Sequence, residues 1–202
     1  MDRYRWNILG LCEMRWKNFG ETTTEEGHEI FFSGKEDKHE HGVGFLVHKD
    51  IVSSSIGCRP VSSRLILIHL RAVPFSITVG QAYVPKSDDD DDEVEEFYDQ
   101  LRMSFIRHRR RLFLLCKETG MQKWARMHMK TGTGLADPAT MTRQMREDSY
   151  SSSLPHDLVL ANTFGHHKAS RRQTWHSTIG QHHNHIDYML VMRSFQSGVN
   201  II

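Results

Sequence analysis

Apolar residues along the chain fall into short runs with the spacing of sheet strands. Residues 6–12 form the first run, which ends at the carboxylate of Glu13. Residues 42–48 (GVGFLVH) and 75–84 (FSITVGQAYV) form two more, and residues 63–72 (SRLILIHLRA) alternate apolar and polar side chains. Alternation with a period of two is typical of a half-buried strand. With two later runs, at 157–161 (DLVLA) and 186–192 (IDYMLVM), the pattern predicts successive strands of a sheet.

One helix is predicted after the strand that Pro85 ends. Ser87 precedes a run of acidic residues at 88–92, and Val94, Phe97, Tyr98 and Leu101 follow at helical spacing. A serine hydroxyl and nearby carboxylates stabilise free N–H groups and the dipole at a helix start. We therefore interpret the aspartate run as a solvated helix N-terminus in preference to a cation site.

The stretch from Arg102 to about Pro155 has a different character. It is rich in Met, Thr, Lys and Arg and shows no sustained period of 2 or 3.6. The pattern predicts an irregular segment. Structureless stretches of such length are uncommon inside a compact domain, which counts either against this assignment or against the chain itself.

Composition and charge limit the classes of protein. The chain of 202 residues suits a single domain, and its 26 basic and 25 acidic residues give a net charge of +1. Nucleic-acid binding would therefore have to be local. Three scattered cysteines favour a reducing compartment. No apolar run or signal-peptide pattern points to a membrane, so we expect a nuclear or cytoplasmic protein of unpredicted oligomeric state.

Three side chains at strand ends are candidates for chemistry. Glu13 follows the first apolar run, and strand ends are where open sheets place functional groups. Its carboxylate suits a hard cation such as Mg²⁺, although a surface carboxylate is the plain alternative. Tyr83 is placed to hydrogen-bond a phosphate or simply to pack. Asp187 opens the last strand, where an Asp can orient an imidazole or hold a metal.

The loop before Asp187 is rich in histidine and basic residues. The H-H-x-H pattern at 182–185 is a weak zinc signature, and no cysteine lies near it in sequence. Lys168, Arg171 and Arg172 form a local basic patch that fits either phosphate binding or a solvated loop.

Whole segments of the chain resemble a known family. They are ILGLCEMRW at 8–16, HEHGVGFLV at 39–47, GQAYVP at 80–85 and IDYML at 186–190. They resemble craniofacial development protein 2-like sequences, which derive from the endonuclease domain of RTE-type LINE retrotransposons. The resemblance extends to the apurinic-endonuclease branch of the endonuclease/exonuclease/phosphatase superfamily. It covers about residues 6–101 and 157–200 of a single partial domain, 1–202, and leaves 102–156 without family character.

This resemblance implies a fold, a reaction and roles for three residues. The fold is an α/β (α+β type) two-sheet sandwich, incomplete here, with its active site at the rim of the sheets. The reaction is hydrolysis of DNA phosphodiesters with Mg²⁺ or Mn²⁺. Glu13 matches the family's metal carboxylate, Tyr83 the tyrosine that contacts the scissile phosphate, and Asp187 the Asp that orients the catalytic histidine.

The chain departs from the family in three places. Family members begin with a T-W-N strand and end with an S-D-H motif, whereas this sequence begins after the first and stops before the second. The central G-D-W-N-A-K-V-G string, which supplies the catalytic Asp and Asn, is also missing. The resemblance therefore implies a relative whose catalytic set is incomplete.

A reading-frame shift explains the missing central motif. Codons for residues 118–125 (ETGMQKWA), read from the third base of each, permit Asp-Trp-Asn-Ala-Lys-Val-Gly. The same shift over 141–149 (MTRQMREDS) permits a run containing Asn-Glu-Arg-Gly-Leu, which is also family-like. We infer that the segment from about Arg102 to about Pro155 is translated out of frame.

Three hypotheses for function follow. The first is a degenerate, inactive relative of the endonuclease. The second is an active metal-dependent nuclease in which Asp137, Glu147 or Asp157 replaces a lost carboxylate. The third is a non-enzymatic interaction module that keeps part of the fold.

Overall fold

The computed structural model describes residues 5–85, 89–108, 112–117, 158–160, 175–176, 183–184 and 187–192. The chain divides into two compact units. The first contains Met1–Tyr83 and Arg111–Leu115, and the second contains Val84–Arg110 and Cys116–Ile202. Among the described residues, no helix is long and apolar enough to cross a membrane.

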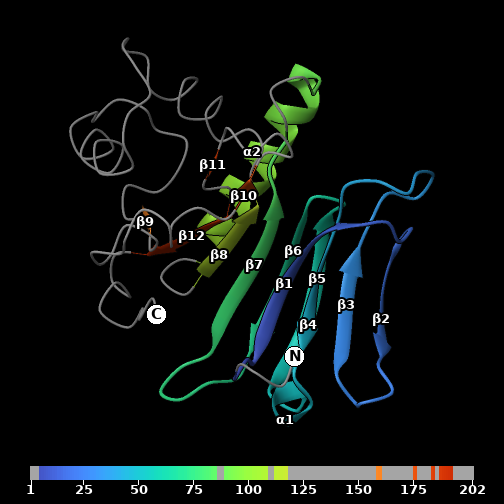
Figure 1. Ribbon diagram of the computed structural model, residues 1–202. Coiled ribbons are helices and arrows are strands. Elements are labelled where there is room, and N and C mark those ends of the chain that lie inside the picture. Colours follow the sequence, from blue (N-terminus) through green and yellow to red (C-terminus); the bar gives the residue numbers. More distant parts are fainter. Residues whose placement is uncertain are drawn as a thin grey trace. The chain divides into compact units, whose positions relative to one another are not determined.

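Two sheets build the first unit (Figure 1). The first sheet has the strand order β1-β4-β3-β2, and the strands β5, β6, β7 and β8 lie side by side in that order in the second. The strands of the first sheet are β1 (Ile8–Met14), β2 (Phe19–Thr23), β3 (Glu29–Ser33) and β4 (Gly42–Val47). The short helix α1 (Lys49–Val52) leads to β5 (Ser55–Ser62), β6 (Leu65–Leu70), β7 (Ile77–Tyr83) and β8 (Leu112–Lys117).

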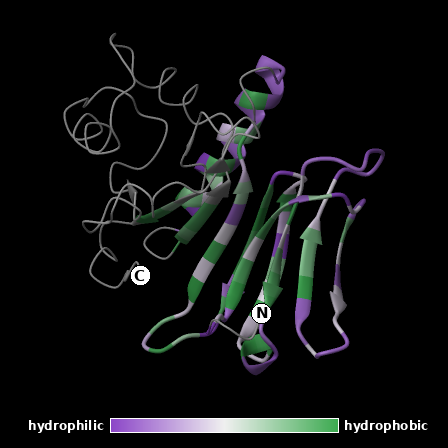
Figure 2. Cartoon of the chain, viewed as in Figure 1, coloured by the Kyte–Doolittle hydropathy of each residue, from purple (hydrophilic) through white to green (hydrophobic). Residues whose placement is uncertain are grey.

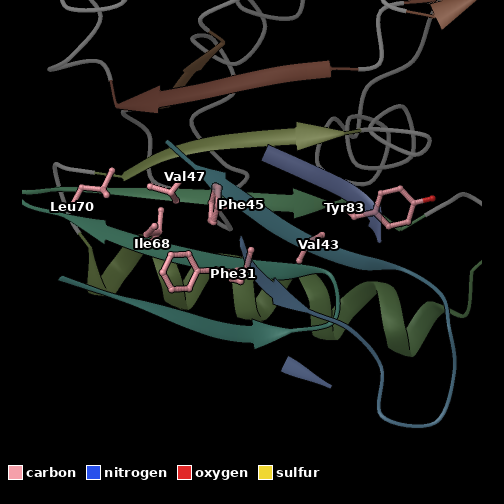
Figure 3. Close-up of a cluster of buried hydrophobic side chains, with 8 residues drawn as sticks. Phe31, Val43, Phe45, Val47, Ile68, Leu70 and Tyr83 are labelled. Carbon is pink, nitrogen blue, oxygen red and sulfur yellow. The ribbon is translucent and has the colours of Figure 1, made fainter. Parts of the chain in front are cut away.

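The core of this unit lies between the inner faces of its sheets. Successive side chains of a strand point to opposite faces, so alternate apolar residues gather on one side. Phe31, Val43, Phe45 and Val47 of the first sheet pack in one buried cluster with Ile66, Ile68, Leu70 and Tyr83 of the second (Figure 3). Burying each such apolar side chain stabilises the fold by roughly 1.5–3 kcal/mol.

Hydropathy follows this arrangement. In Figure 2 the strands that carry the cluster are coloured mainly hydrophobic, whereas the long loop between β3 and β4 is hydrophilic. That loop, residues 34–41, carries most of the charged groups discussed below.

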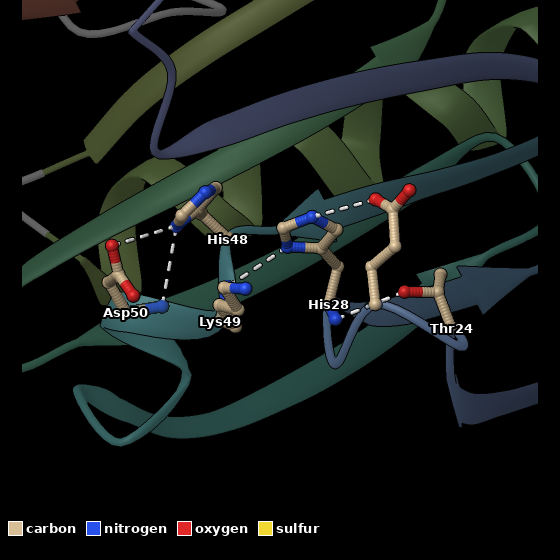
Figure 4. A network of polar contacts seen from close by, with 6 residues as sticks. Thr24, His28, His48, Lys49 and Asp50 are labelled. Atoms are coloured by element: carbon tan, nitrogen blue, oxygen red, sulfur yellow. Dashed lines mark hydrogen bonds and ion pairs between the residues drawn. The ribbon is translucent and has the colours of Figure 1, made fainter. Parts of the chain in front are cut away.

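A network of histidines closes one end of the first sheet (Figure 4). The Nδ1 atom of His28 accepts the backbone N–H of Lys49 at 3.1 Å, and that of His48 accepts the N–H of Asp50 at 3.3 Å. Trp6 packs against both imidazoles, with ring centroids 5.0 Å and 4.9 Å apart. The network ties the turn between β2 and β3 to the start of α1, at the end of β1 opposite Glu13.

The second unit contains a long helix and short paired strands. The helix α2 (Asp91–Arg107) buries one face at helical spacing, through Val94, Phe97, Leu101, Ser104 and Phe105. The strands are β9 (Leu158–Leu160), β10 (Trp175–His176), β11 (His183–Asn184) and β12 (Asp187–Met192). β12 pairs antiparallel with β9, and β10 pairs antiparallel with β11.

The structure confirms the predicted fold class, an α+β sandwich of two sheets with few helices. It also corrects the start of α2. The N-cap is Asp90, whose carboxylate accepts the N–H of Asp92 at 2.9 Å, and the helix begins at Asp91. Ser87, the predicted cap, lies outside the described residues.

A second correction concerns the stretch predicted to be irregular from Arg102 onward. The helix continues to Arg107, and the strand β8 follows at Leu112–Lys117. The prediction was wrong for these residues because Leu101 and Phe105 continue the buried helical face, and Leu112 and Leu114 are buried at strand spacing. Residues 118–157 lie outside the described residues.

Candidate functional site

Glu13 occupies a β-bulge near the end of β1. The register between β1 and β4 shifts at this point, since Cys12 pairs with Val43 and Met14 pairs with Gly42. Glu13 is therefore the extra residue, and its φ of 60° is in the left-handed region, which costs a non-glycine residue roughly 1–2 kcal/mol. The bulge leaves the Glu13 side chain exposed at the rim of the sheet. Strained residues of this kind concentrate at functional sites.

Gly42 allows the opposite strand to approach the bulge. A Cβ atom added to Gly42 would lie 2.1 Å from the backbone oxygen of Met14, so a larger residue would push the strands apart. His41, the residue before it, also has a left-handed backbone with a φ of 61°. Both strands are therefore distorted where Glu13 is presented.

Tyr83 ends β7, as the sequence predicted, but it is buried and only 3% exposed. The His41 ring stacks on it, with centroids 5.9 Å apart and an angle of 27° between the planes. The Arg64 guanidinium carbon lies 5.5 Å from the centre of the Tyr83 ring. In Figure 3 the hydroxyl points away from the other labelled core side chains. Packing is thus an observed role of Tyr83, and its contact with a phosphate stays a prediction.

An ion-pair cluster lies in the loop before His41. The Nζ atom of Lys35 and the Nε2 atom of His41 lie 3.3 Å and 3.7 Å from one carboxylate oxygen of Glu40. Lys38 is at 3.9 Å from the same oxygen. The hydrogen bond from Lys35 lowers the pKa of Glu40, with smaller contributions from the nearby positive charges against the effect of desolvation. The Glu40 carboxylate is therefore engaged in ion pairs with the basic groups of its own loop.

The described residues do not by themselves fit a divalent metal site. Among them, no group of three or more His, Cys, Asp or Glu side chains is arranged to hold an ion. Hard cations such as Mg²⁺ and Ca²⁺ take about six or more oxygen ligands, so one exposed carboxylate at Glu13 is a weak site. The metal role of Glu13 stays a prediction.

Asp187 begins β12, in agreement with the strand predicted over 186–192. It belongs to the second unit, and its side chain is outside the described part of the chain. Its role in orienting a histidine stays a prediction. The same holds for the histidine-rich loop, of which the structure describes the backbone pairing of His176 with His183. Lys168, Arg171, Arg172 and the proposed substitutes Asp137, Glu147 and Asp157 lie outside the described residues.

Sequence reasoning missed two neighbours of Tyr83. Arg64 is 3% exposed, although arginine is rarely buried, and its carbonyl accepts the N–H of Tyr83 at 2.9 Å. His41 was noticed only as part of a family-like segment. The one available signal was a basic residue directly before the apolar run of β6, and that signal does not say which aromatic ring the side chain meets.

Comparisons with known proteins agree with the resemblance seen in the sequence. No protein-family model matches the chain. Craniofacial development protein 2 of Bos taurus is 28% identical over 204 residues, which cover 98% of this chain and 33% of that protein. The same protein of Tragulus javanicus is 28% identical and is covered to 34%. The chain thus spans about a third of the length of these relatives, and the alignment also crosses residues 102–156.

Two solved structures share the fold. The endonuclease domain of TRAS1, a telomere-specific non-LTR retrotransposon, has a TM-score of 0.51 at 12% identity and covers 83% of this chain and 68% of that one. The 3′ phosphatase NExo from Neisseria, bound to a product DNA hairpin, has a TM-score of 0.59 at 16% identity and covers 95% and 78%. The chain is therefore similar to craniofacial development protein 2 over almost its whole length and has the sandwich fold of endonuclease/exonuclease/phosphatase domains.

Proposed function

We propose that this chain is a degenerate relative of a metal-dependent DNA endonuclease and that it no longer cleaves phosphodiesters. The observation that carries the relation is Glu13, an exposed carboxylate in a left-handed bulge at the sheet rim, within a fold shared with a retrotransposon endonuclease domain. A strained non-glycine residue persists only where its surroundings hold it, which supports an inherited functional position.

The proposed loss of cleavage rests on the sequence. The central Asp–Asn string of the family is absent from the sequence. Phosphodiester hydrolysis requires charge stabilisation on the phosphate and a positioned water, and single groups removed from such a unit typically cost several powers of ten in rate. A DNA partner and a Mg²⁺ or Mn²⁺ requirement belong to the proposed ancestral activity, and residual metal binding through Glu13 would be weak.

A plasmid-nicking assay tests this proposal. The purified full chain is incubated with supercoiled plasmid and Mg²⁺ or Mn²⁺, beside a chelator control. Two variants accompany it, Glu13→Gln and the matched control Glu36→Gln, which removes an exposed carboxylate from the loop between β3 and β4. We expect no nicking above the chelator background from any of the three proteins.

Nicking that needs both the metal and Glu13 would overturn the proposed inactivity and favour an active nuclease with replaced ligands. Nicking that persists in Glu13→Gln but needs the metal would show that the site residues have been assigned wrongly. Weak nicking that is equal for Glu13→Gln with metal and for the unchanged protein in chelator would indicate a contaminating nuclease, which repurification removes.

A further inference from the structure

Trp16 is an exposed aromatic residue three positions after Glu13. Its side chain is 43% exposed, and its ring meets Phe32 of β3 edge-on, with centroids 4.9 Å apart and an interplanar angle of 89°. Edge-to-face contacts of this kind favour one ring orientation. Phe32 holds Trp16 in place, while much of the indole stays in contact with solvent.

The backbone around Trp16 is held firmly. The N–H of Asn18 donates to the Lys35 oxygen at 3.1 Å, and the N–H of Gly34 donates to the Asn18 oxygen at 2.7 Å. The His39 ring donates from Nδ1 to the Arg15 oxygen at 2.7 Å. A Cβ atom on Gly34 would lie 1.9 Å from the Trp16 oxygen, so the two segments touch directly. A side chain presented by such a fixed turn loses little freedom when it binds a ligand.

The aromatic pair lies on the outer face of the first sheet. Phe31 belongs to the core, so Phe32, the next residue, points to the opposite face. The Phe32 ring lies over Gly20 of β2, where an added Cβ atom would be 3.1 Å from the ring carbon Cζ. Because Gly20 has no side chain, the Phe32 ring approaches the backbone of β2 closely, and it meets the Trp16 ring edge-on.

Basic residues flank Trp16 in the sequence. Arg15 and Lys17 are both exposed and are the immediate neighbours of Trp16. Lys35 and Lys38 are paired with Glu40, so they contribute less to the field at this surface. A fixed aromatic ring with a basic residue on each side of it in the sequence has the composition of a stacking site for an unpaired nucleobase, with the phosphates met by the cations.

On the basis of the proposed relation to DNA endonucleases, we propose that Trp16 is a stacking platform for a base of single-stranded nucleic acid, with Arg15 and Lys17 binding the adjacent phosphates. The site needs no metal. It is therefore independent of the lost cleavage step and is retained in a protein that does not cut.

Fluorescence anisotropy with a labelled oligonucleotide of about 12 nucleotides, within the roughly 4–16 nucleotides typical of such sites, tests the proposal. Binding by the full chain is measured in chelator, for the unchanged protein and for Trp16→Ala, Trp16→Phe and Phe19→Ala. Phe19 is the matched control because it is 69% exposed on β2 and pairs with Ser33, which places it on the opposite face of the sheet from Phe32.

We expect Trp16→Ala to weaken binding about tenfold, in the range of one lost base stack, and Trp16→Phe to retain most of the affinity. Phe19→Ala should bind like the unchanged protein. Replacing Arg15 and Lys17 together by Gln should reduce the slope of log affinity against log salt by about 1–2, roughly one unit for each lost phosphate contact.

A second probe leaves the protein unchanged and so avoids any effect of the substitutions on folding. An oligonucleotide of the same length with an abasic backbone should bind about tenfold more weakly than the normal strand, because it keeps the phosphates and lacks the bases. Three results would each contradict the proposed stacking role of Trp16. They are equal affinity for the two strands, equal losses of affinity in Trp16→Ala and Phe19→Ala, and no binding by the unchanged protein. None of these results bears on the nicking assay, so the two proposals fail separately.

Discussion

Three single residues set the backbone conformation at the rim of the first sheet, near the ends of β1, β2 and β4. Glu13, Asn18 and His41 all have φ values near 60°, a region that is uncommon for residues other than glycine. Each lies where a strand ends or where the chain turns, and each is followed or faced by a close backbone contact, as at Gly42 and Gly34. The rim near Glu13 and Trp16 is thus shaped by backbone geometry as much as by side-chain chemistry.

Cys58 gives a prediction at this scale. Burial raises the pKa of its thiol from 9.0 to about 12, with smaller increases from the carboxylates of Glu21 and Glu29 and an opposing hydrogen bond from the Arg59 backbone. The thiolate is the reactive form. We expect iodoacetamide to modify Cys58 far more slowly at pH 8 in the folded chain than in urea, as followed by peptide mass spectrometry.

The same shift fixes a pH dependence. The folded state holds the Cys58 proton more tightly, so its contribution to stability is complete below pH 9 and is lost as the pH rises from 9 towards 12. A Cys58→Ala variant should lose stability less steeply over that window than the unchanged protein. Equal slopes of stability against pH in the two proteins would contradict this prediction. Iodoacetamide labelling of Cys58 in native buffer at the rate found in urea would contradict the labelling prediction.

At the scale of elements, the helix α2 shows how a local signal fixes a boundary only approximately. A long acidic run offers several possible caps, and the structure selects Asp90, with three further acidic residues in the first turn at Asp91, Asp92 and Glu93. Carboxylates at this end interact favourably with the helix dipole. The buried face, from Val94 to Phe105, then decides which residues can be helical.

The cap at Asp90 can be tested by substitution. Asp90→Ala removes the acceptor of the Asp92 N–H and should lower the free energy of unfolding by about 1 kcal/mol, within the usual range of about 0.5–2. Asp90→Asn keeps a capping oxygen and should cost much less. Urea unfolding followed by circular dichroism measures both, and equal losses in the two variants would show that charge, and not the cap, is what Asp90 supplies.

At the scale of the whole molecule, the two units differ in how much of them is described. The first is a sandwich with a continuous apolar core, whereas much of the second is outside the described residues. The out-of-frame hypothesis applies to the second unit. The structure describes a helix to Arg107 and a strand at Leu112–Lys117, and both family-like shifted segments, 118–125 and 141–149, lie after this point.

Restoring the reading frame tests that hypothesis. A variant in which residues 118–155 are replaced by the family-like shifted translation should regain the central Asp–Asn string. We expect a higher free energy of unfolding and a larger urea m-value, since more surface is buried on folding. A variant carrying the same replacement residues in scrambled order is the control, and an m-value no higher than that of this control would contradict the hypothesis.

The sequence by itself determined the elements with strong periodic patterns and the family they resemble. The strand β6 and the helix α2 were predicted because burial of one face leaves a period of 2 or 3.6 in the residues themselves, and β1, β4, β7, β9 and β12 were predicted from short apolar runs. β2, β3, β5 and β8 of the first unit were not predicted. Of these, β2 and β5 are edge strands of their sheets, where one side pairs with no described strand and the burial pattern is weak, and β5 also contains Pro60.

Only the tertiary structure decided the surroundings of the candidate residues. The position of Glu13 at a strand end was visible in the sequence, but its left-handed bulge depends on the register of β1 against β4. Tyr83 is buried beside His41 and Arg64 because pairing and stacking of strands bring together residues that are far apart in the chain. Periodicity reports which face of an element is buried, whereas the identity of the neighbours on that face is a property of the assembled sheets.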